Sequence, residues 1–161
     1  MVDDDRSLSA TPDEPRWLSR EEQDAWSALV AMLLLLPGRL DGPLQAATGL
    51  TTFEYLVLSH TSEAPGRRLR MSELAALANG SLSRLSNVVK RLERRGWMQR
   101  QPDPSNGRYT IASLTEQGWE VVVGAAPTHV ASVRHVLLDR LNGRDQADLI
   151  RLAARLGAHI T

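Results

Sequence analysis

The sequence predicts a mainly α-helical fold of the α+β class, with a small β-hairpin wing. Apolar residues recur at helical spacing through most of the 161 residues, and Ser, Thr or Asn precedes several of these stretches as a helix cap. Two short helical segments meet at a turn containing Asn79 and Gly80, which is the outline of a helix-turn-helix. Two strand-like segments flank the turn DPSNG just beyond it. Together these observations predict a winged helix-turn-helix embedded in a helical dimerisation region.

The first part of the chain predicts an arm followed by a long helix. Residues 1–16 are polar and acidic, which is typical of a loose, flexible arm. Ser19 opens the sequence SREE, which has the spacing of a capping box, so a helix should begin there. Pro37 and Gly38 predict that this helix kinks or ends, with a remnant to about Asp41.

Three more helices are predicted before the hairpin. Thr51 begins one with a second capping box, and this helix ends before Pro65. Ser72 should cap the short helix SELAALA. Ser81 should cap the next, SLSRLSNVVKRLERR, which stops at Gly96.

The hairpin and two helices complete the chain. WMQRQ is a strand candidate, DPSNG has strong turn chemistry, and RYTIASL has the β-branched residues of a returning strand. Thr115 should cap a long helix that Pro127 bends, and Asn142-Gly143 should separate it from a last helix.

The charges are segregated although the net charge is zero. Residues 1–24 carry a net charge of −5, whereas residues 66–108 carry +7. A basic block in a neutral chain favours a local surface for a polyanion, and an ordinary solvated surface is the alternative. The longest apolar run, residues 28–36, is far shorter than the ~20 residues of a membrane span, so no membrane contact is expected.

The helix predicted at 81–95 has two distinct faces. At about 100° per residue, Leu82, Leu85, Val88, Val89 and Leu92 fall on one side. The other side has the side chains that contact bases or phosphates in a DNA major groove. The candidate DNA-binding residues of this helix are Ser81, Ser83, Arg84, Asn87, Lys90, Arg91 and Arg94. The alternative is an amphipathic surface helix whose last arginines complement its dipole.

The flanking segments add further DNA-contact candidates. Asn106, Gly107 and Arg108 stand at the predicted hairpin tip, from which a long cation can enter a minor groove. The alternative is that Arg108 folds back to pair with Asp103. Four more residues are predicted to contact the DNA backbone, namely Arg67, Arg68, Arg70 and Ser72.

Over residues 18–160 the chain resembles the MarR family of bacterial transcriptional regulators. The matching stretches are MSELAALA, SLSRLSNVVKRLERRGWMQR, DPSNGRYTIASLT and TEQG. One position departs from the family pattern. Asn106 stands where the family usually has an aspartate two residues before the wing arginine, so Arg108 would be held less firmly. With no cysteine in the chain, the cysteine-based oxidation sensing of one branch of the family is excluded, as are disulfides.

The resemblance implies a homodimer that binds a near-palindromic operator in double-stranded DNA, as a repressor. It also implies release by a small phenolic or anionic effector bound in a cleft between the dimerisation and DNA-binding regions. The aliphatic residues of both terminal helices independently favour a dimer. They are Leu29, Leu33, Leu36, Leu149, Leu152, Leu156 and Ile160.

The predicted organisation follows from these elements. Residues 1–16 form the flexible acidic arm, 17–47 the N-terminal dimerisation helix, 48–114 the winged helix-turn-helix and 115–161 the C-terminal dimerisation helices. Aromatic residues that could line an effector cleft, unless they belong to the core, are Trp17, Trp26, Phe53, Tyr55 and Trp119.

Two other functions fit the sequence less well. An enzyme is disfavoured because the chain has no phosphate loop, dinucleotide fingerprint or nucleophile elbow, so no catalytic residue, metal ligand or cofactor is predicted. A winged helix used only for protein–protein contact remains the alternative, although it does not require an arginine-lined face. A DNA-binding regulator would be cytoplasmic and associated with the nucleoid.

Overall fold

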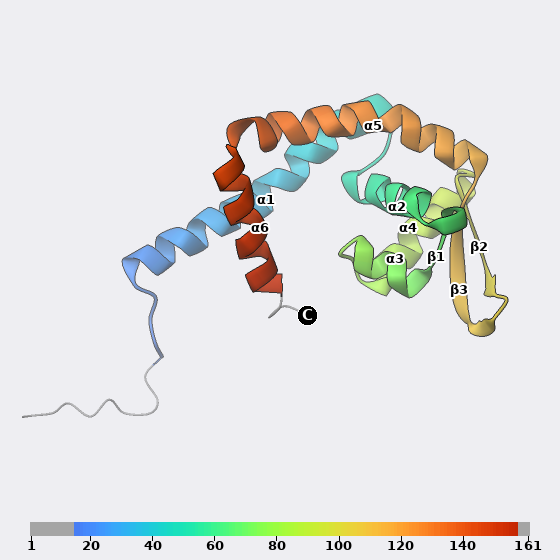
Figure 1. Ribbon diagram of the computed structural model, residues 1–161, viewed down its shortest axis with the longest axis horizontal. Coiled ribbons are helices and arrows are strands. Elements are labelled where there is room, and N and C mark those ends of the chain that lie inside the picture. The colour runs from blue at the N-terminus through green and yellow to red at the C-terminus, as the bar shows by residue number, and fades with distance from the viewer. Residues whose placement is uncertain (1–14, 158–161) are drawn as a thin grey trace, which may run out of the picture. The chain divides into compact units, whose positions relative to one another are not determined.

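The computed structural model describes residues 15–157, and Figure 1 shows its helices and strands. Most of the predicted arm, residues 1–14, lies outside the described residues, as does Ile160. The elements in order are α1 (Arg20–Thr48), α2 (Thr52–Glu63), the 3-10 turn η1 (Pro65–Arg67), β1 (Arg68–Arg70), α3 (Met71–Leu77), α4 (Leu82–Arg94), β2 (Met98–Asp103), β3 (Asn106–Leu114), α5 (Glu116–Val136), η2 (Leu138–Arg140) and α6 (Gly143–Gly157). The mainly helical fold with a small antiparallel sheet is confirmed.

The chain forms two compact units, one up to Leu34 and the other from Leu35 onward. The second unit contains the apolar core, built from α2, α3, α4, the sheet and the first half of α5. Its fully buried leucines come from the end of α1, the loop that follows it, α2, α3 and α4. They are Leu44, Leu50, Leu58, Leu74, Leu85 and Leu92. This core fixes the helix-turn-helix and the hairpin on one scaffold.

Helix α1 continues past the predicted break. It includes Pro37 and Pro43 and ends only at Thr48, so the expected end near Asp41 is wrong. A proline interrupts one hydrogen bond of the helix ladder, and flanking turns can continue when they are anchored. The last turns of α1 are anchored, because Leu44 is buried and the Asp41 carboxylate accepts a 2.7 Å hydrogen bond from the Thr52 N–H.

Most predicted caps are present. Thr51 forms a capping box with Glu54, and Ser81 and Thr115 each accept a hydrogen bond from a backbone N–H of the helix that follows. The predicted cap at Ser72 is wrong, because α3 begins at Met71 and its N-cap residue is Arg70, without a side-chain cap. The short strand β1 leads directly into α3 and therefore sets its start.

The sheet has three strands in the order β1-β3-β2, all antiparallel, rather than the two of the predicted hairpin. Strand β1 has only three residues with a single apolar one, Leu69, so no alternating pattern signals it. The hairpin turn is Pro104–Ser105, because Asp103 pairs with Asn106. An irregularity in register follows Pro102, so residues 107–109 lie in a bulged part of β3. Asn106-Gly107 is thus beside the tip and not the tip itself.

The chain leaves the wing through a close contact. A Cβ atom on Gly118, in the first turn of α5, would lie 2.1 Å from the carbonyl oxygen of Trp97. Only glycine fits here, so the TEQG sequence brings α5 directly against the start of the hairpin. Helix α5 then runs through Pro127 to Val136, and Asn142 caps α6 by accepting from the N–H groups of Arg144 and Asp145.

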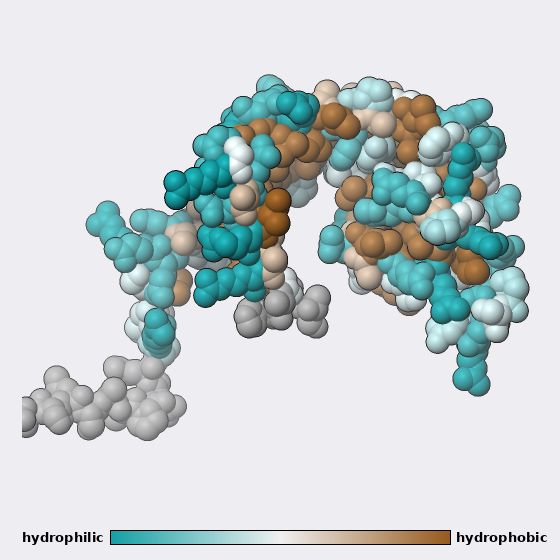
Figure 2. Space-filling view, in the orientation of Figure 1, coloured by the Kyte–Doolittle hydropathy of each residue, from teal (hydrophilic) through white to brown (hydrophobic). Residues whose placement is uncertain are grey.

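Large apolar side chains remain exposed on the terminal helices. Figure 2 shows apolar side chains gathered along α5 and on one side of α6. The exposed set includes Leu33, Leu34, Val123, Val130, Leu149, Ile150, Leu152 and Leu156. By length and composition α1 and the segment Glu116–Arg140 could each cross a membrane, which is weak evidence because packed helices of soluble proteins meet the same criterion.

Candidate nucleic-acid interface

Helix α4 separates apolar from cationic side chains as predicted. Leu85, Val88, Val89 and Leu92 are buried in the core, although Leu82, assigned to the same face, is 54% exposed at the first turn. The opposite face is exposed and acid-poor, and it carries Ser83, Asn87, Lys90 and Arg94 together with Arg84. The hydroxyl of Ser81 is used as the helix cap, where it accepts a hydrogen bond from the Arg84 N–H.

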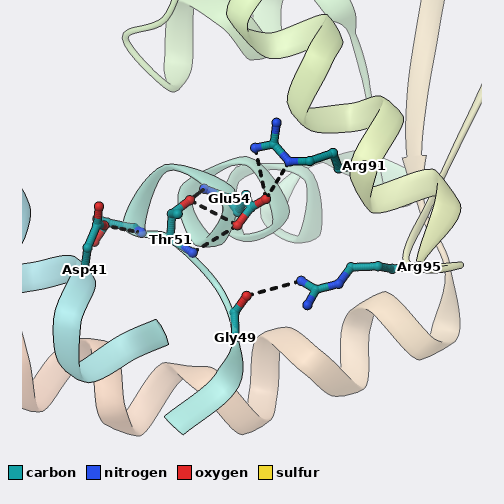
Figure 3. A network of polar contacts seen from close by, with 7 residues as sticks. Asp41, Gly49, Thr51, Glu54, Arg91 and Arg95 are labelled. Carbon is teal, nitrogen blue, oxygen red and sulfur yellow. Dashed lines mark hydrogen bonds and ion pairs between the residues drawn. The ribbon is translucent and has the colours of Figure 1, made fainter. Parts of the chain in front are cut away.

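Arg91 is engaged within the domain. Its Nε and Nη2 atoms donate to Oε1 of Glu54 at 3.2 and 3.1 Å, and Glu54 is 7% exposed (Figure 3). Oε2 of the same carboxylate accepts from the N–H and the hydroxyl of Thr51. Arg91 therefore joins α4 to the first turn of α2, and a role in DNA contact competes with this pairing.

A second arginine joins the same junction. Arg95, at the end of α4, donates from Nη1 to the carbonyl oxygen of Gly49 at 3.3 Å and stacks on Trp97. Asp41 caps Thr52 on the far side of the junction (Figure 3). The loop between α1 and α2 is thus held to the end of the predicted recognition helix by side chains that the sequence did not single out.

Arg70 holds the turn end of the wing. Its guanidinium pairs with Asp103 at 2.8 Å and lies over the Tyr109 ring, 4.7 Å from the centroid. The hydroxyl and backbone N–H of Ser105, followed by Arg70, lower the pKa of the Asp103 carboxyl to about 2. The ionised carboxylate therefore closes the hairpin turn and ties β2 to β1.

Arg108 is exposed beside this cluster. Its guanidinium makes no hydrogen bond or ion pair with any residue of 15–157, so it does not fold back onto Asp103. Asn106 Oδ1 accepts a 3.1 Å hydrogen bond from the Arg108 backbone N–H. The amide at position 106 consequently orients the backbone of Arg108 and leaves the guanidinium free.

The other predicted backbone contacts have different surroundings. Arg67 pairs with Glu116 at 3.0 Å and lies over Trp119, whereas Arg68 and Ser72 are exposed. A groove of about 260 Å³ runs between the wing and the start of α3 and α4. Its lining includes Arg70, Ser72 and Arg108, and also Ser86 and Arg100, which were not predicted. Arg100 pairs with Glu93, so it is not a free cation.

A separate open groove of about 760 Å³ lies between α2 and α5. Two of the predicted cleft aromatics, Tyr55 and Trp119, line it, together with Glu63 and Arg134. The remaining three are elsewhere: Phe53 packs beside the helix-turn-helix turn, and Trp17 and Trp26 are exposed residues of the first unit.

Solved structures resemble this arrangement of helix-turn-helix, wing and long helices. Sco3205 from Streptomyces coelicolor, a MarR family transcriptional regulator solved in complex with DNA, is 42% identical, with a TM-score of 0.85 over 90% of this chain and 91% of that chain. AbsC, another MarR family regulator from the same organism, is 38% identical, with a TM-score of 0.85 over 91% of this chain and 98% of that chain. The model of the MarR family matches residues 50–110.

The chain belongs to the MarR family of transcriptional regulators. The transcriptional repressor Mb2911 of Mycobacterium bovis is 33% identical over 116 residues, which are 68% of this chain and 77% of that protein. The match to the regulator YdcH of Bacillus subtilis is shorter, at 32% identity over 78 residues and about half of each chain. Membership in this family confirms the prediction of a transcriptional regulator over that of an enzyme.

Proposed function

We propose that this MarR family protein binds double-stranded DNA sequence-specifically as a homodimer and represses transcription from a near-palindromic operator. The observation that carries the proposal is the segregation on α4, where the aliphatic face is buried and the exposed face is cationic beside a free wing arginine, Arg108. The DNA complex of the 42% identical Sco3205 supports this role. Such a regulator would act in the cytoplasm at the nucleoid.

The contacts of each residue divide the predicted DNA-binding set. Exposed side chains that make no side-chain hydrogen bond or ion pair with residues 15–157 are assigned to DNA, and these are Ser83, Arg84, Asn87, Lys90, Arg94 and Arg108. Arg67, Arg70 and Arg91 pair with carboxylates and are assigned mainly to holding the interface in shape. Arg68 and Ser72 are exposed, and we keep them as phosphate contacts.

The dimer is supported by the apolar side chains that the single chain leaves exposed. Leu33 is 61% exposed in α1, and Leu152 and Leu156 are 46% and 49% exposed in α6. Large apolar patches on a soluble chain mark interaction surfaces, and burying them against a second copy would remove them from water. A dimer interface would also explain why two helices are as long and apolar as membrane-spanning helices.

An effector site is the second part of the proposal. The open groove between α2 and α5 is lined by the aromatic residues Tyr55 and Trp119, with Arg134 as a cation and Glu63 as an acid. Such a lining suits a small aromatic anion, the phenolic or anionic effector expected for the family. Salicylate or benzoate should raise the melting temperature of the wild-type protein. The rise should be smaller for the Arg134→Ala variant, and an equal rise in both would contradict the site.

One experiment tests the main function. The full-length protein selects duplexes from a random pool, and binding to the selected duplex is compared with binding to random duplex over a range of salt concentrations. We expect a two-fold symmetric consensus and a preference of at least about a thousandfold for the selected duplex. Equal affinity for both duplexes, or no binding at low salt, would overturn the proposal and favour a protein–protein adaptor.

A further inference from the structure

Four arginines of residues 15–157 lie over aromatic rings: Arg67 on Trp119, Arg70 on Tyr109, Arg84 on Phe53 and Arg95 on Trp97. Three of these guanidinium groups also donate to an oxygen of the protein. The acceptors are Glu116 for Arg67, Asp103 for Arg70 and the Gly49 carbonyl for Arg95. Arg84 differs from the other three, because its guanidinium donates to no acceptor among the described residues. Its Cζ lies 4.0 Å from the centroid of the Phe53 ring.

The ring under Arg84 is held in place by the helix-turn-helix turn. Phe53 is half-buried against the core in the first turn of α2. A Cβ atom on Gly80, in the turn between α3 and α4, would lie 2.6 Å from Cζ of Phe53 and 2.8 Å from Cε2. Glycine at position 80 leaves the space that the ring occupies, and a larger side chain there would displace the ring from its present position near the start of α4.

The stack restrains Arg84 without using its hydrogen-bond donors. A guanidinium that lies flat on a ring uses its face for the contact, and its N–H groups remain in the plane. Two such N–H groups can donate together to O6 and N7 of a guanine in the major groove. Arg84 occupies the first turn of α4 at the edge of its cationic face, where base contacts of a recognition helix concentrate.

We propose that Phe53 is a positioning residue for DNA recognition, whose ring orients Arg84 for a bidentate contact with one guanine in each operator half-site. Gly80 is the companion position that lets the ring reach Arg84. This inference rests on the proposed DNA-binding function. A cation–π contact at an exposed site corresponds to about a two- to fivefold change in affinity per half-site.

The test uses 7-deazaguanine, which lacks the N7 acceptor, placed at single guanines of the duplex selected by the wild-type protein. Wild-type affinity should fall at one symmetry-related guanine position, and Arg84→Ala should be insensitive there. Phe53→Leu keeps an apolar side chain against Gly80 but removes the ring. It should bind the selected duplex more weakly and lose part of the deazaguanine sensitivity, while random-duplex affinity stays within about twofold. Phe53→Tyr keeps the ring and should match wild type.

The outcomes separate this inference from the proposed function. Wild-type protein that binds no duplex overturns both. Wild-type binding with undiminished deazaguanine sensitivity in Phe53→Leu overturns only the role of Phe53. Should Phe53→Leu fail to fold, Phe53→Met takes its place, because methionine also removes the ring and keeps an apolar side chain against Gly80. Arg84→Lys tests the guanidinium itself, because lysine keeps the charge but has neither the plane nor the paired donors. It should lose the deazaguanine effect, and equal losses on the selected and random duplexes would make Arg84 a phosphate contact and overturn the inference.

Discussion

Arg91 and Glu54 form a two-point contact between the predicted recognition helix and the first turn of α2. Both donors of Arg91 reach the same oxygen, Oε1, and the second oxygen of Glu54 completes the capping box with Thr51. The carboxylate is buried while the arginine is about half exposed. One side chain therefore both starts α2 and fixes the angle at which α4 leaves the core.

Replacing Glu54 with glutamine should destabilise the domain by about 1.5–3 kcal/mol, the range for losing hydrogen bonds to a charged group. Glutamine keeps the size and one acceptor oxygen, so the change isolates the charge. The measurement is the free energy of unfolding in urea. Arg91→Ala combined with Glu54→Gln should cost less than the sum of the two single changes, because they remove the same interaction.

Lys90 provides the matched control, since it is the exposed neighbour of Arg91 on the same helix. Lys90→Ala should leave the free energy of unfolding within about 0.5 kcal/mol and should weaken binding to DNA with a shallower salt dependence. Arg91→Ala should show the reverse pattern, with reduced stability and nearly unchanged salt dependence. The same loss of salt dependence in both variants would assign Arg91 to the DNA backbone.

The starts of most helices were predictable because they carry local signals. The capping sequences at Ser19, Thr51 and Ser81 and the period of buried leucines depend only on neighbouring residues. The predicted break at Pro37 is wrong because contacts with residues farther along the chain let α1 continue. Leu44 is buried in the core, and the Asp41 carboxylate accepts a hydrogen bond from the Thr52 N–H. Strand β1 could not be predicted because its three residues are too few to show the alternation of polar and apolar side chains that marks a strand.

The position of the cationic face on α4 was predictable, but which of its arginines pair with carboxylates of the protein was not. Periodicity places Arg84 and Arg91 on one side of α4, yet it does not reveal that Glu54 of another helix pairs with Arg91. Pairs between residues far apart in sequence, such as Arg70 with Asp103, exist only once the core has brought the elements together. One sequence signal could have indicated the Glu54–Arg91 pair. Glu54 is the acid of a capping box, and the arginine-rich face of α4 has almost no acid of its own to pair with.

A dimer should appear in light scattering as twice the 17.8 kDa chain mass at micromolar concentration. Leu152→Glu puts a charge on the exposed apolar side of α6 and should shift the mass toward the monomer. Leu77→Glu is the control, because Leu77 is similarly exposed at 49% but lies in α3, outside the terminal helices. A wild-type monomer, or equal dissociation by both variants, would refute the proposed interface.

The hairpin turn should respond to acid through Asp103. Its pKa is lowered to about 2 from an ordinary value of 3.8, so the ionised carboxylate stabilises the fold fully above about pH 4 and loses this contribution as the pH falls toward 2. Asp103→Asn should therefore unfold at lower urea than wild type at pH 7, and the difference should shrink between pH 4 and pH 2. Asp139→Asn, in the exposed pair with Arg134, should change little at either pH. A constant difference for Asp103→Asn down to pH 2 would contradict the assignment.

The wing arginine Arg108 should act in DNA binding and not in stability. Arg108 has no side-chain partner among residues 15–157, so Arg108→Ala should leave the unfolding midpoint and the dimer mass nearly unchanged. Losing charge-assisted hydrogen bonds in a minor groove should weaken binding to the selected duplex by about tenfold or more per half-site. The loss should shrink when A·T steps flanking the half-site are replaced by G·C, because the narrow groove that attracts arginine is then lost.

Asn106→Asp tests how Arg108 is held. Asn106 Oδ1 accepts from the Arg108 N–H, and a carboxylate oxygen can take the same bond, so the backbone should keep its shape. The added negative charge would lie near the phosphates, and we expect binding to weaken by about two- to fivefold, with a larger effect at low salt. Tighter binding would show that orientation of the guanidinium limits affinity, as the departure from the family pattern at position 106 first indicated. A melting curve of Asn106→Asp that matches wild type is required for either conclusion, because only then does the change in affinity report on the wing.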